Sequence, residues 1–237
     1  MLASVVICTY NAAPTLGKAI ESALNQSLDS NEYEVLVIDD GSRDNTDIIV
    51  ESYAKWHCNL RSIQFPLNRG LVPACNYGIN ASLGDHFIRL DADDEMHTDI
   101  LSKSIEAMSK RDTDLVYTDR CEVDLDTGKS ILCQIEPFNL FRMIAAGTLM
   151  RTDILRRIRG YRPFFWEEYD LYIRYLQTSG KPPVRLPAPM YTYNRHGRSM
   201  TADLRRVHEG WAQLRDEWGD DVLRQHGWSG PDSQEAT

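Results

Sequence analysis

The sequence lacks a disulfide framework, a membrane-spanning run and a basic excess, and each absence excludes a class of protein. Its five cysteines are an odd number with no Cys-x-x-Cys pair, which is typical of reduced thiols rather than of a disulfide-stabilised secreted domain. No apolar run reaches the roughly 18 residues of a transmembrane helix. The formal net charge of −9 disfavours a nucleic-acid partner, because such proteins normally carry a basic surface.

An export signal is missing as well. Residues 1–14 are apolar but have neither a basic region nor a small-residue cleavage site, so we interpret them as a first buried strand. We therefore expect a cytoplasmic protein. Five arginines in residues 151–162 leave peripheral contact with the inner face of the membrane open, although a solvated helix face is the alternative interpretation.

Two nucleotide-binding motifs do not occur. Without GxGxxG, the fingerprint of a nicotinamide dehydrogenase is absent. Gly128-Lys129-Ser130 matches the end of a P-loop, but Val123 stands where the first glycine of that motif belongs. The sequence also predicts a hairpin there instead of a strand followed by a helix, which excludes a P-loop nucleotidase.

What the first half of the chain does contain is an alternation of strand and helix signals. Short β-branched runs predict strands at 2–8, 33–38, 60–65, 85–90 and 113–118. Helical spacing predicts helices from Pro14 to Leu24, from Thr46 to about Trp56, over 71–82 and over roughly 97–110. This alternation is typical of an α/β fold with a parallel sheet, in which ligands bind at the carboxyl ends of the strands.

The second half has a different pattern. It predicts a hairpin at 121–133, helical segments near 138–146 and 152–158, a helix at 167–179, a strand near 184–193 and a helix at 203–226. We treat residues 1–226 as one domain, with halves at 1–118 and 119–202 and a C-terminal helix at 203–226. The polar residues 227–237 are predicted to form a disordered tail. The oligomeric state stays open.

Four polar clusters follow the first four predicted strands, where core packing does not require them. They are Thr9-Tyr10-Asn11, Asp39-Asp40, Asn68-Arg69-Gly70 and Asp91 to Asp94. In the last cluster, Asp91 and Asp93 form an Asp-x-Asp pair that suits Mg²⁺ or Mn²⁺ bound to phosphate oxygens. The alternative is a helix N-cap, but three aspartates in four residues exceed what one cap needs.

Two later clusters also carry candidate chemistry. Glu167, Glu168 and Asp170 follow Trp166, and a carboxylate in an aromatic-lined cleft can act as a general base. The alternative is a first helical turn made acidic to suit the helix dipole. His196 lies in the segment 193–199, where it would neutralise a diphosphate or ligate the metal, unless it is only a surface residue.

Taken in order, six stretches resemble family 2 glycosyltransferases with the GT-A fold, over roughly residues 3–201. They are CTYN, VIDDGSRDNT, NRG, RLDADD, EEYDLYIR and HGRSMT. The resemblance implies a single Rossmann-like, mostly parallel sheet flanked by helices, with a C-terminal acceptor subregion and a terminal helix. It also implies inverting transfer of a sugar from a nucleotide-diphosphate donor, with a UDP-sugar favoured and Mn²⁺ or Mg²⁺ as cofactor. The acceptor would be a saccharide, lipid-linked or protein hydroxyl in bacterial-type surface polysaccharide or glycoconjugate synthesis.

The resemblance assigns donor-binding roles to several residues of the strand-end clusters. Thr9, Tyr10 and Asn11 would contact the nucleotide, with Tyr10 near the base. Asp39 would accept the N3–H of uracil or thymine, and Arg69 would be the donor-side residue of the third loop.

The remaining roles concern the metal and the chemistry. Asp91 would face the ribose and Asp93 would ligate the metal directly, while His196 and Ser199 would close over the diphosphate. Glu168 stands where the family has the Asp of its Glu-Asp motif, the catalytic base. Because this chain has Glu167-Glu168 there, the base stays open among Glu167, Glu168 and Asp170.

Two other functions remain as alternatives. A sugar-phosphate nucleotidyltransferase would normally have a glycine-rich loop with Lys or Arg after its first strand, where this chain has CTYNAAPTL. A catalytically silent nucleotide-sugar-binding module would lack the Asp-x-Asp pair or the base, and both are present.

Overall fold

The computed structural model describes residues 1–144, 146–197 and 203–230. Its strands are β1 (Ala3–Thr9), β2 (Tyr33–Asp39), β3 (Leu60–Gln64), β4 (His86–Asp91), β5 (Glu95–Met96), β6 (Leu115–Asp124), β7 (Ser130–Cys133), β8 (Leu149–Arg151) and β9 (Val184–Arg195). Its helices are α1 (Ala13–Leu24), α2 (Thr46–Ala54), α3 (Leu71–Ala81), α4 (Ile100–Lys110), α5 (Thr152–Arg157), α6 (Glu167–Ser179) and α7 (Leu204–Gln225), with a 3₁₀ turn η1 (Leu140–Arg142).

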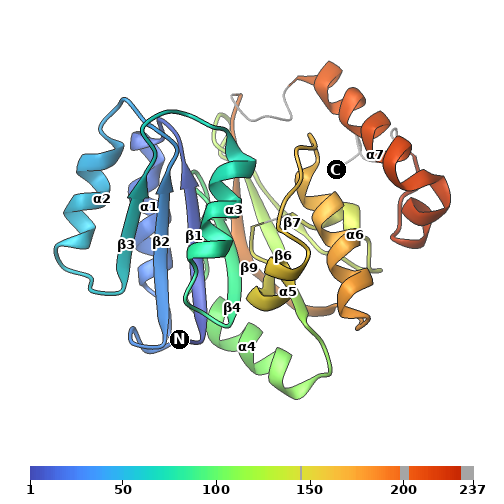
Figure 1. The fold of residues 1–237 in the computed structure, drawn as a ribbon, viewed down its shortest axis with the longest axis horizontal. Coiled ribbons are helices and arrows are strands. Elements are labelled where there is room, and N and C mark those ends of the chain that lie inside the picture. The colour runs from blue at the N-terminus through green and yellow to red at the C-terminus, as the bar shows by residue number, and fades with distance from the viewer. Residues whose placement is uncertain (145, 198–202, 231–237) are drawn as a thin grey trace.

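The strands form one sheet in the order β3-β2-β1-β4-β8-β6-β9-β5, and β7 pairs with β6 (Figure 1). The first four strands of this order are parallel, and β8 joins β4 in the antiparallel sense. Strands β6 and β9 are parallel to each other. The predicted α/β fold with a mostly parallel sheet is confirmed.

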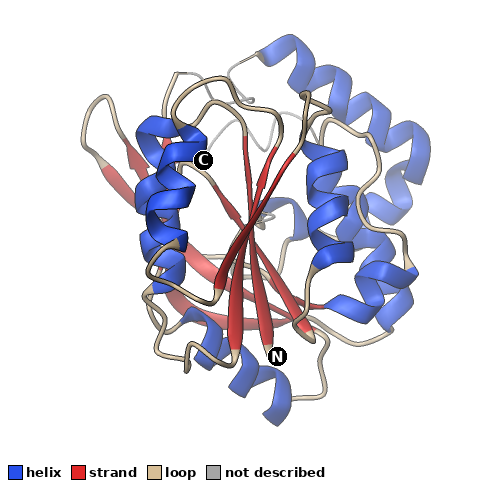
Figure 2. Ribbon diagram, turned by 60° about the vertical axis from the view of Figure 1, so that its left-hand side comes forward, coloured by secondary structure: helices blue, strands red, loops and turns tan. Residues whose placement is uncertain are grey.

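The central strands are apolar on both faces because helices cover both faces (Figure 2). In β1, Val6 faces the cluster formed with α3, α5, α6 and α7, while Val5 and Ile7 face the cluster formed with α1, α2 and α4. Alternate residues of a strand point to opposite faces. A Cβ atom on Gly78 of α3 would lie 2.5 Å from Val6 Cγ1, so glycine lets this helix pack closely on β1.

The second half departs from its predicted elements in one segment. The helix predicted near 138–146 is limited to η1, after which Met143 has extended main-chain angles (φ −75°, ψ 155°). Leu140, Phe141 and Met143 are nevertheless buried. These apolar residues therefore pack into the core from an irregular segment and not from a helix. The short strands β5 and β8 were outside the predicted set, whereas the hairpin of β6 and β7 is confirmed.

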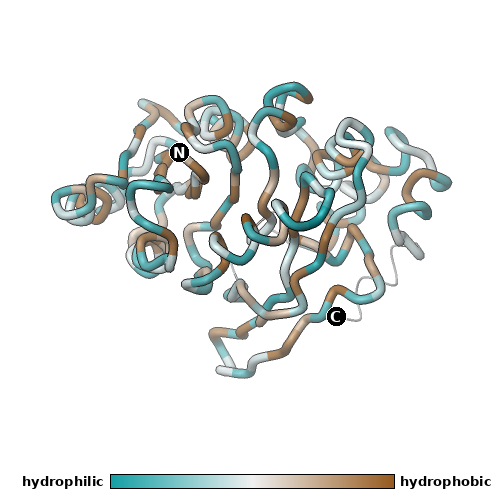
Figure 3. The backbone as a smooth tube through the Cα atoms, turned by 90° about the horizontal axis from the view of Figure 1, so that it is seen from below, coloured by the Kyte–Doolittle hydropathy of each residue, from teal (hydrophilic) through white to brown (hydrophobic). Residues whose placement is uncertain are grey.

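The C-terminal helix packs over α6 and changes direction at Gly219, whose φ is 72°. Beyond it, Trp228 is 7% exposed and the Gly227 carbonyl accepts a hydrogen bond from Asn139 Nδ2 at 2.8 Å. Ser199 and residues 231–237 of the predicted tail lie outside the described residues. Within the described ranges, no helix combines the length and apolar character needed to cross a membrane, and the helices show both polar and apolar positions in Figure 3.

Candidate active site

A cavity of about 1280 Å³ lies at the carboxyl ends of β1 and β4. The pairing register brings Cys8 of β1 opposite Asp91 of β4, and Thr9 opposite Asp39 of β2. The β6–β7 hairpin, the start of α6 and the start of α7 supply the other walls. The predicted meeting of polar clusters at this sheet edge is confirmed for the acidic clusters that follow β2 and β4.

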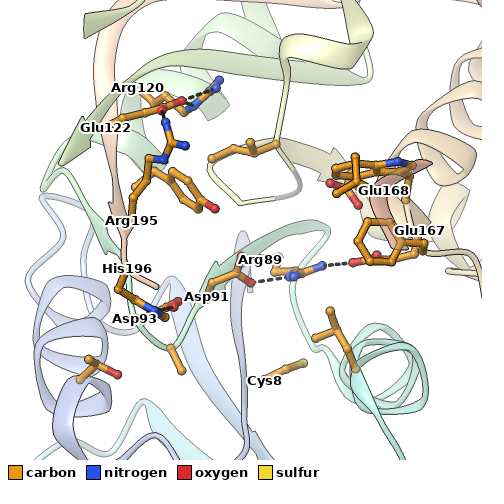
Figure 4. Close-up of a pocket in the computed structure, with 18 of the residues that line it drawn as sticks. Cys8, Arg89, Asp91, Asp93, Arg120, Glu122, Glu167, Glu168, Arg195 and His196 are labelled. Carbon is orange, nitrogen blue, oxygen red and sulfur yellow. Dashed lines mark hydrogen bonds and ion pairs between the residues drawn. The ribbon is translucent and has the colours of Figure 1, made fainter. Parts of the chain in front are cut away.

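The acidic turn after β4 lines one side of this cavity. Asp93 is half-buried, and its Oδ2 lies 2.8 Å from Nε2 of His196 on the segment after β9. Asp91 lines the same cavity and is also half-buried. Figure 4 shows Asp91, Asp93 and His196 grouped on this side. Asp93 and His196, which are 103 residues apart in the chain, thus lie in contact, and their roles stay predictions.

The third aspartate of the turn holds the turn in place. Asp94 is 1% exposed, and its carboxylate accepts hydrogen bonds from the Tyr191 hydroxyl and the Asn194 main-chain N–H, both at 2.7 Å. Burial, followed by the charge of Asp91, raises the pKa of Asp94 to about 8, and Asp93 adds to this. The turn therefore carries mutually repelling carboxylates, which a bound cation would relieve.

A buried arginine joins the acidic turn to the opposite wall. The guanidinium of Arg89 donates to Asp91 Oδ1 at 2.7 Å and to Glu167 Oε1 at 3.0 Å, and both Arg89 and Glu167 are buried. Figure 4 shows Arg89 between the two groups. No motif marks Arg89 in the sequence, although an arginine inside a strand otherwise buried on both faces requires a carboxylate partner.

The three acids at the start of α6 have three different environments. Glu167 is paired with Arg89, and Asp170 is fully buried among Arg162, Arg174 and the indole N–H of Trp218. Glu167 and Glu168 both line the cavity, and Glu168 has no ion pair among the described residues. Its burial, and next the charge of Glu167, raise the pKa of the Glu168 carboxyl well above its ordinary value. The geometry thus separates the three candidates that the sequence left open and favours Glu168.

The role of Asp170 as a structural ion-pair centre can be tested by Asp170→Asn. Its carboxylate accepts from Arg174 Nε at 2.9 Å and from Trp218 Nε1 at 3.2 Å, so the change leaves the half-buried Arg174 without its counter-charge and Arg162 with only Glu217. We expect a loss of about 3–5 kcal/mol in the free energy of unfolding, measured by urea denaturation. An exposed-helix control, Asp216→Asn on α7, should stay within about 0.5 kcal/mol. Equal stability of the two variants would contradict this role.

The end of β1 and the loop after it contain both exposed and buried residues. Tyr10 is 48% exposed and lines the cavity together with Asn11. The Asn11 side chain accepts a hydrogen bond from the Arg43 main-chain N–H at 2.8 Å, which ties this loop to the loop after β2. Thr9 is 3% exposed, so its side chain lies inside the protein. Nucleotide contact by these three residues stays a prediction.

The predicted base-reading and donor-side residues, Asp39 and Arg69, are not among the residues that line the cavity. Asp39 is 4% exposed, and its carboxylate accepts from the Ser42 main-chain N–H at 2.9 Å and from Gln64 Nε2 at 3.0 Å. Arg69 is exposed, with its guanidinium 4.9 Å from the centre of the Phe65 ring. Both follow their strands as expected, and their proposed contacts with the donor are untested by this geometry.

The cavity also contains residues that the sequence analysis did not single out. Arg120 and Glu122 from β6 and Arg142 from η1 line it. Trp211 from α7 joins them and stacks on Tyr169, with ring centres 5.6 Å apart. No local motif marks these positions, because tertiary contacts alone bring them to the cavity.

Comparisons with known proteins agree with this arrangement. The model of the family described as glycosyl transferase family 2 matches residues 4–170. An uncharacterized glycosyltransferase of Rickettsia typhi is 34% identical over 198 residues, which are 75% of this chain and 59% of that protein. The chain spans between 31% and 66% of the length of eight relatives that it matches.

Two solved structures share the fold at low sequence identity. TarS 1–349 of S. aureus, in complex with UDP-GlcNAc, has a TM-score of 0.77 at 17% identity, over 95% of this chain and 71% of that chain. The mannosyltransferase PcManGT from Pyrobaculum calidifontis, in complex with GDP-Man and Mn²⁺, has a TM-score of 0.71 at 16% identity, over 97% and 66%. The expected GT-A fold is thereby confirmed. Because the family model covers well over half of its residues, this chain belongs to glycosyl transferase family 2.

Proposed function

We propose that the chain transfers a hexosyl group from a nucleotide-diphosphate donor, a UDP-sugar by preference, to an acceptor hydroxyl with inversion at the anomeric carbon. One observation carries this proposal. A single cavity holds an acidic turn with an imidazole on one side and a carboxyl group with a raised pKa, Glu168, on the other. The solved relatives were captured with UDP-GlcNAc and with GDP-Man and Mn²⁺, which supports this class of donor.

The acidic side suits a divalent cation. Asp93 would hold Mn²⁺ or Mg²⁺, with Asp91 and His196 beside it, because carboxylate oxygen and imidazole nitrogen are suitable ligands for such ions. Among the described residues, no three His, Cys, Asp or Glu side chains converge as a complete ligand set, so the donor's phosphate oxygens would complete the coordination. When bound, the cation would stabilise the negative charge of the diphosphate leaving group.

The opposite side suits proton removal. Glu168 would take the proton of the acceptor hydroxyl, and its raised pKa makes the carboxylate a stronger base than an exposed glutamate. Glu167 is occupied by its ion pair with Arg89, so that Glu168 is the member of the pair available to accept the proton. Figure 4 shows Glu168 across the cavity from Asp93. A base and a leaving group on opposite sides are the arrangement that an inverting displacement requires.

Nucleotide release tests the proposal. The protein is incubated with Mn²⁺ and a panel of UDP- and GDP-sugars, and we expect release of UDP or GDP from at least one donor. Formation of pyrophosphate from UTP and a sugar 1-phosphate would instead establish the nucleotidyltransferase alternative. Donor binding without any turnover, across a panel of saccharide and lipid-linked acceptors, would establish the silent binding module.

A further inference from the structure

A cationic wall lies across the cavity from the ends of β1 and β4. We define it as Arg120 and Arg195, on the paired strands β6 and β9, and Arg142 in η1. Arg120 donates to Glu122 Oε1 from Nε at 2.9 Å and from Nη2 at 2.6 Å, and it also donates to the Arg142 carbonyl at 2.6 Å. Arg120 therefore fixes the wall and has little freedom to bind a ligand.

The other two arginines are less engaged. The side chain of Arg195 is 53% exposed, and its contact with Glu122 is long, at 3.4 Å. Arg142 lines the cavity, and no ion pair to its guanidinium occurs among the residues described. The carboxylates that line this wall are Glu122 and Asp126. Of these three guanidiniums, that of Arg142 therefore has no carboxylate partner among the described residues and leaves its positive charge facing the cavity.

This wall is separate from the predicted diphosphate side. His196 and Arg195 are adjacent in the chain, yet His196 contacts Asp93 of the acidic turn while Arg195 contacts Glu122. Figure 4 shows Arg120, Glu122 and Arg195 as a group apart from Asp93 and His196. The wall is therefore placed to meet a second ligand rather than the leaving group.

An aromatic surface connects the cationic wall with Glu168. Phe141 immediately precedes Arg142, and Trp166 lies two residues before Glu168; both line the cavity. Buried Trp211 supports them, with ring centres 5.8 Å from Phe141 and 5.0 Å from Trp166. A saccharide ring bound beside Trp166 would lie near Glu168, in the same cavity that the three arginines line.

We propose that the cationic wall binds an oxyanion carried by the acceptor, so that the acceptor is an acidic saccharide bearing a phosphate ester or a carboxylate. Arginine suits both groups because its planar guanidinium forms paired hydrogen bonds to phosphate and carboxylate oxygens. The inference deepens the proposed function and rests on it: the oxyanion would orient the acceptor hydroxyl toward Glu168.

Calorimetry on the full chain tests the inference. The protein is first saturated with UDP and Mn²⁺, which measures donor-site binding and occupies that site. Glucose, glucuronic acid and glucose 1-phosphate are then titrated separately. We expect at least one charged sugar to bind about 10-fold or more tightly than glucose, and Arg142→Ala or Arg195→Ala to remove that advantage. Comparison of glucuronic acid with glucose 1-phosphate distinguishes the carboxylate from the phosphate ester.

The matched control is Arg157→Ala, an arginine on α5 whose side chain is 65% exposed and which lies outside the cavity lining. It should leave the affinity for the charged sugars unchanged, and thermal unfolding verifies that all variants are folded. Equal affinities for charged and neutral sugars, or affinities unaffected by both arginine changes, would overturn the inference. If UDP and Mn²⁺ fail to bind, the proposed donor site is wrong, and the same sugar titrations on the unliganded protein still decide the role of the arginines.

Discussion

Glu168→Gln is expected to lower kcat by about 10²–10⁴-fold while donor binding is retained, because general-base assistance is typically worth that much. The amide occupies nearly the same space but cannot accept a proton at neutral pH. The neighbours that fix α6 are unchanged, since Glu167 keeps its pair with Arg89 and Asp170 keeps its pair with Arg174. Steady-state kinetics with a donor identified by nucleotide release, together with calorimetry of UDP binding, measure the two quantities.

The pH profile gives the same assignment a second readout. Burial raises the pKa of Glu168, so the wild-type rate should fall as the pH drops through a value above the ordinary glutamate range. That acid limb should be absent from the residual activity of Glu168→Gln. The stability of the fold changes with pH in the opposite direction to the rate. A carboxyl group whose pKa is raised in the folded state stabilises the fold below its unfolded-state pKa, and this stabilisation is lost as the pH rises through the folded-state pKa. The glutamine variant should therefore unfold at a higher temperature than wild type at neutral pH.

A matched control is available on the surface of α4. Glu106 is exposed and pairs with Lys110 one turn away, so Glu106→Gln should leave kcat and its pH profile unchanged. Near-full turnover by Glu168→Gln would exclude Glu168 as the base. A large loss of UDP affinity in that variant would instead mean that Glu168 acts on the donor side.

The strand-end position of the candidate site followed from the sequence because it depends on local patterns. Apolar runs such as 33–38 specify buried strands, and parallel strands end at one edge, so the polar residues after β1, β2 and β4 had to meet there. The sequence patterns did not predict the environment of each acidic residue on α6. Glu168 and Asp170 lie about 200° apart around a helix with 3.6 residues per turn, which shows that they face different ways but not which one faces the cavity.

No sequence motif linked Arg89, or Arg120 and Arg142 of the cationic wall, to the candidate site. Arg120 and Arg142 are 22 residues apart, and only the return of the chain through η1 places them together. Two arginines of the run at 151–162 meet acceptors within the protein. Arg156 donates to the carbonyl groups of Ile79 and Ser82, and Arg162 pairs with Asp170. The number of arginines in a segment is thus a weaker guide to their role than the acceptors that they contact in the folded protein.

Asp93→Ala is expected to weaken metal-dependent UDP binding by more than about 100-fold. Changes to residues that only support a metal ligand typically cost 10–100-fold in affinity, and loss of the direct ligand should cost more. The Asp93 carboxylate is half-buried and lines the cavity, so its removal should leave the fold intact. Calorimetric titration of UDP with and without Mn²⁺ separates this effect from a general loss of nucleotide affinity.

The neighbouring aspartates should respond differently if Asp93 is the direct ligand. Asp91 is held by Arg89 at 2.7 Å, so Asp91→Asn should reduce the affinity less than Asp93→Ala. Asp47→Ala on exposed α2 should leave UDP binding and its Mn²⁺ dependence unchanged. The difference in affinity with and without Mn²⁺ should vanish in Asp93→Ala and persist in both other variants. Retention of the full Mn²⁺ effect by Asp93→Ala would move the metal away from this turn, and the mutual repulsion of its carboxylates would then need another counter-charge.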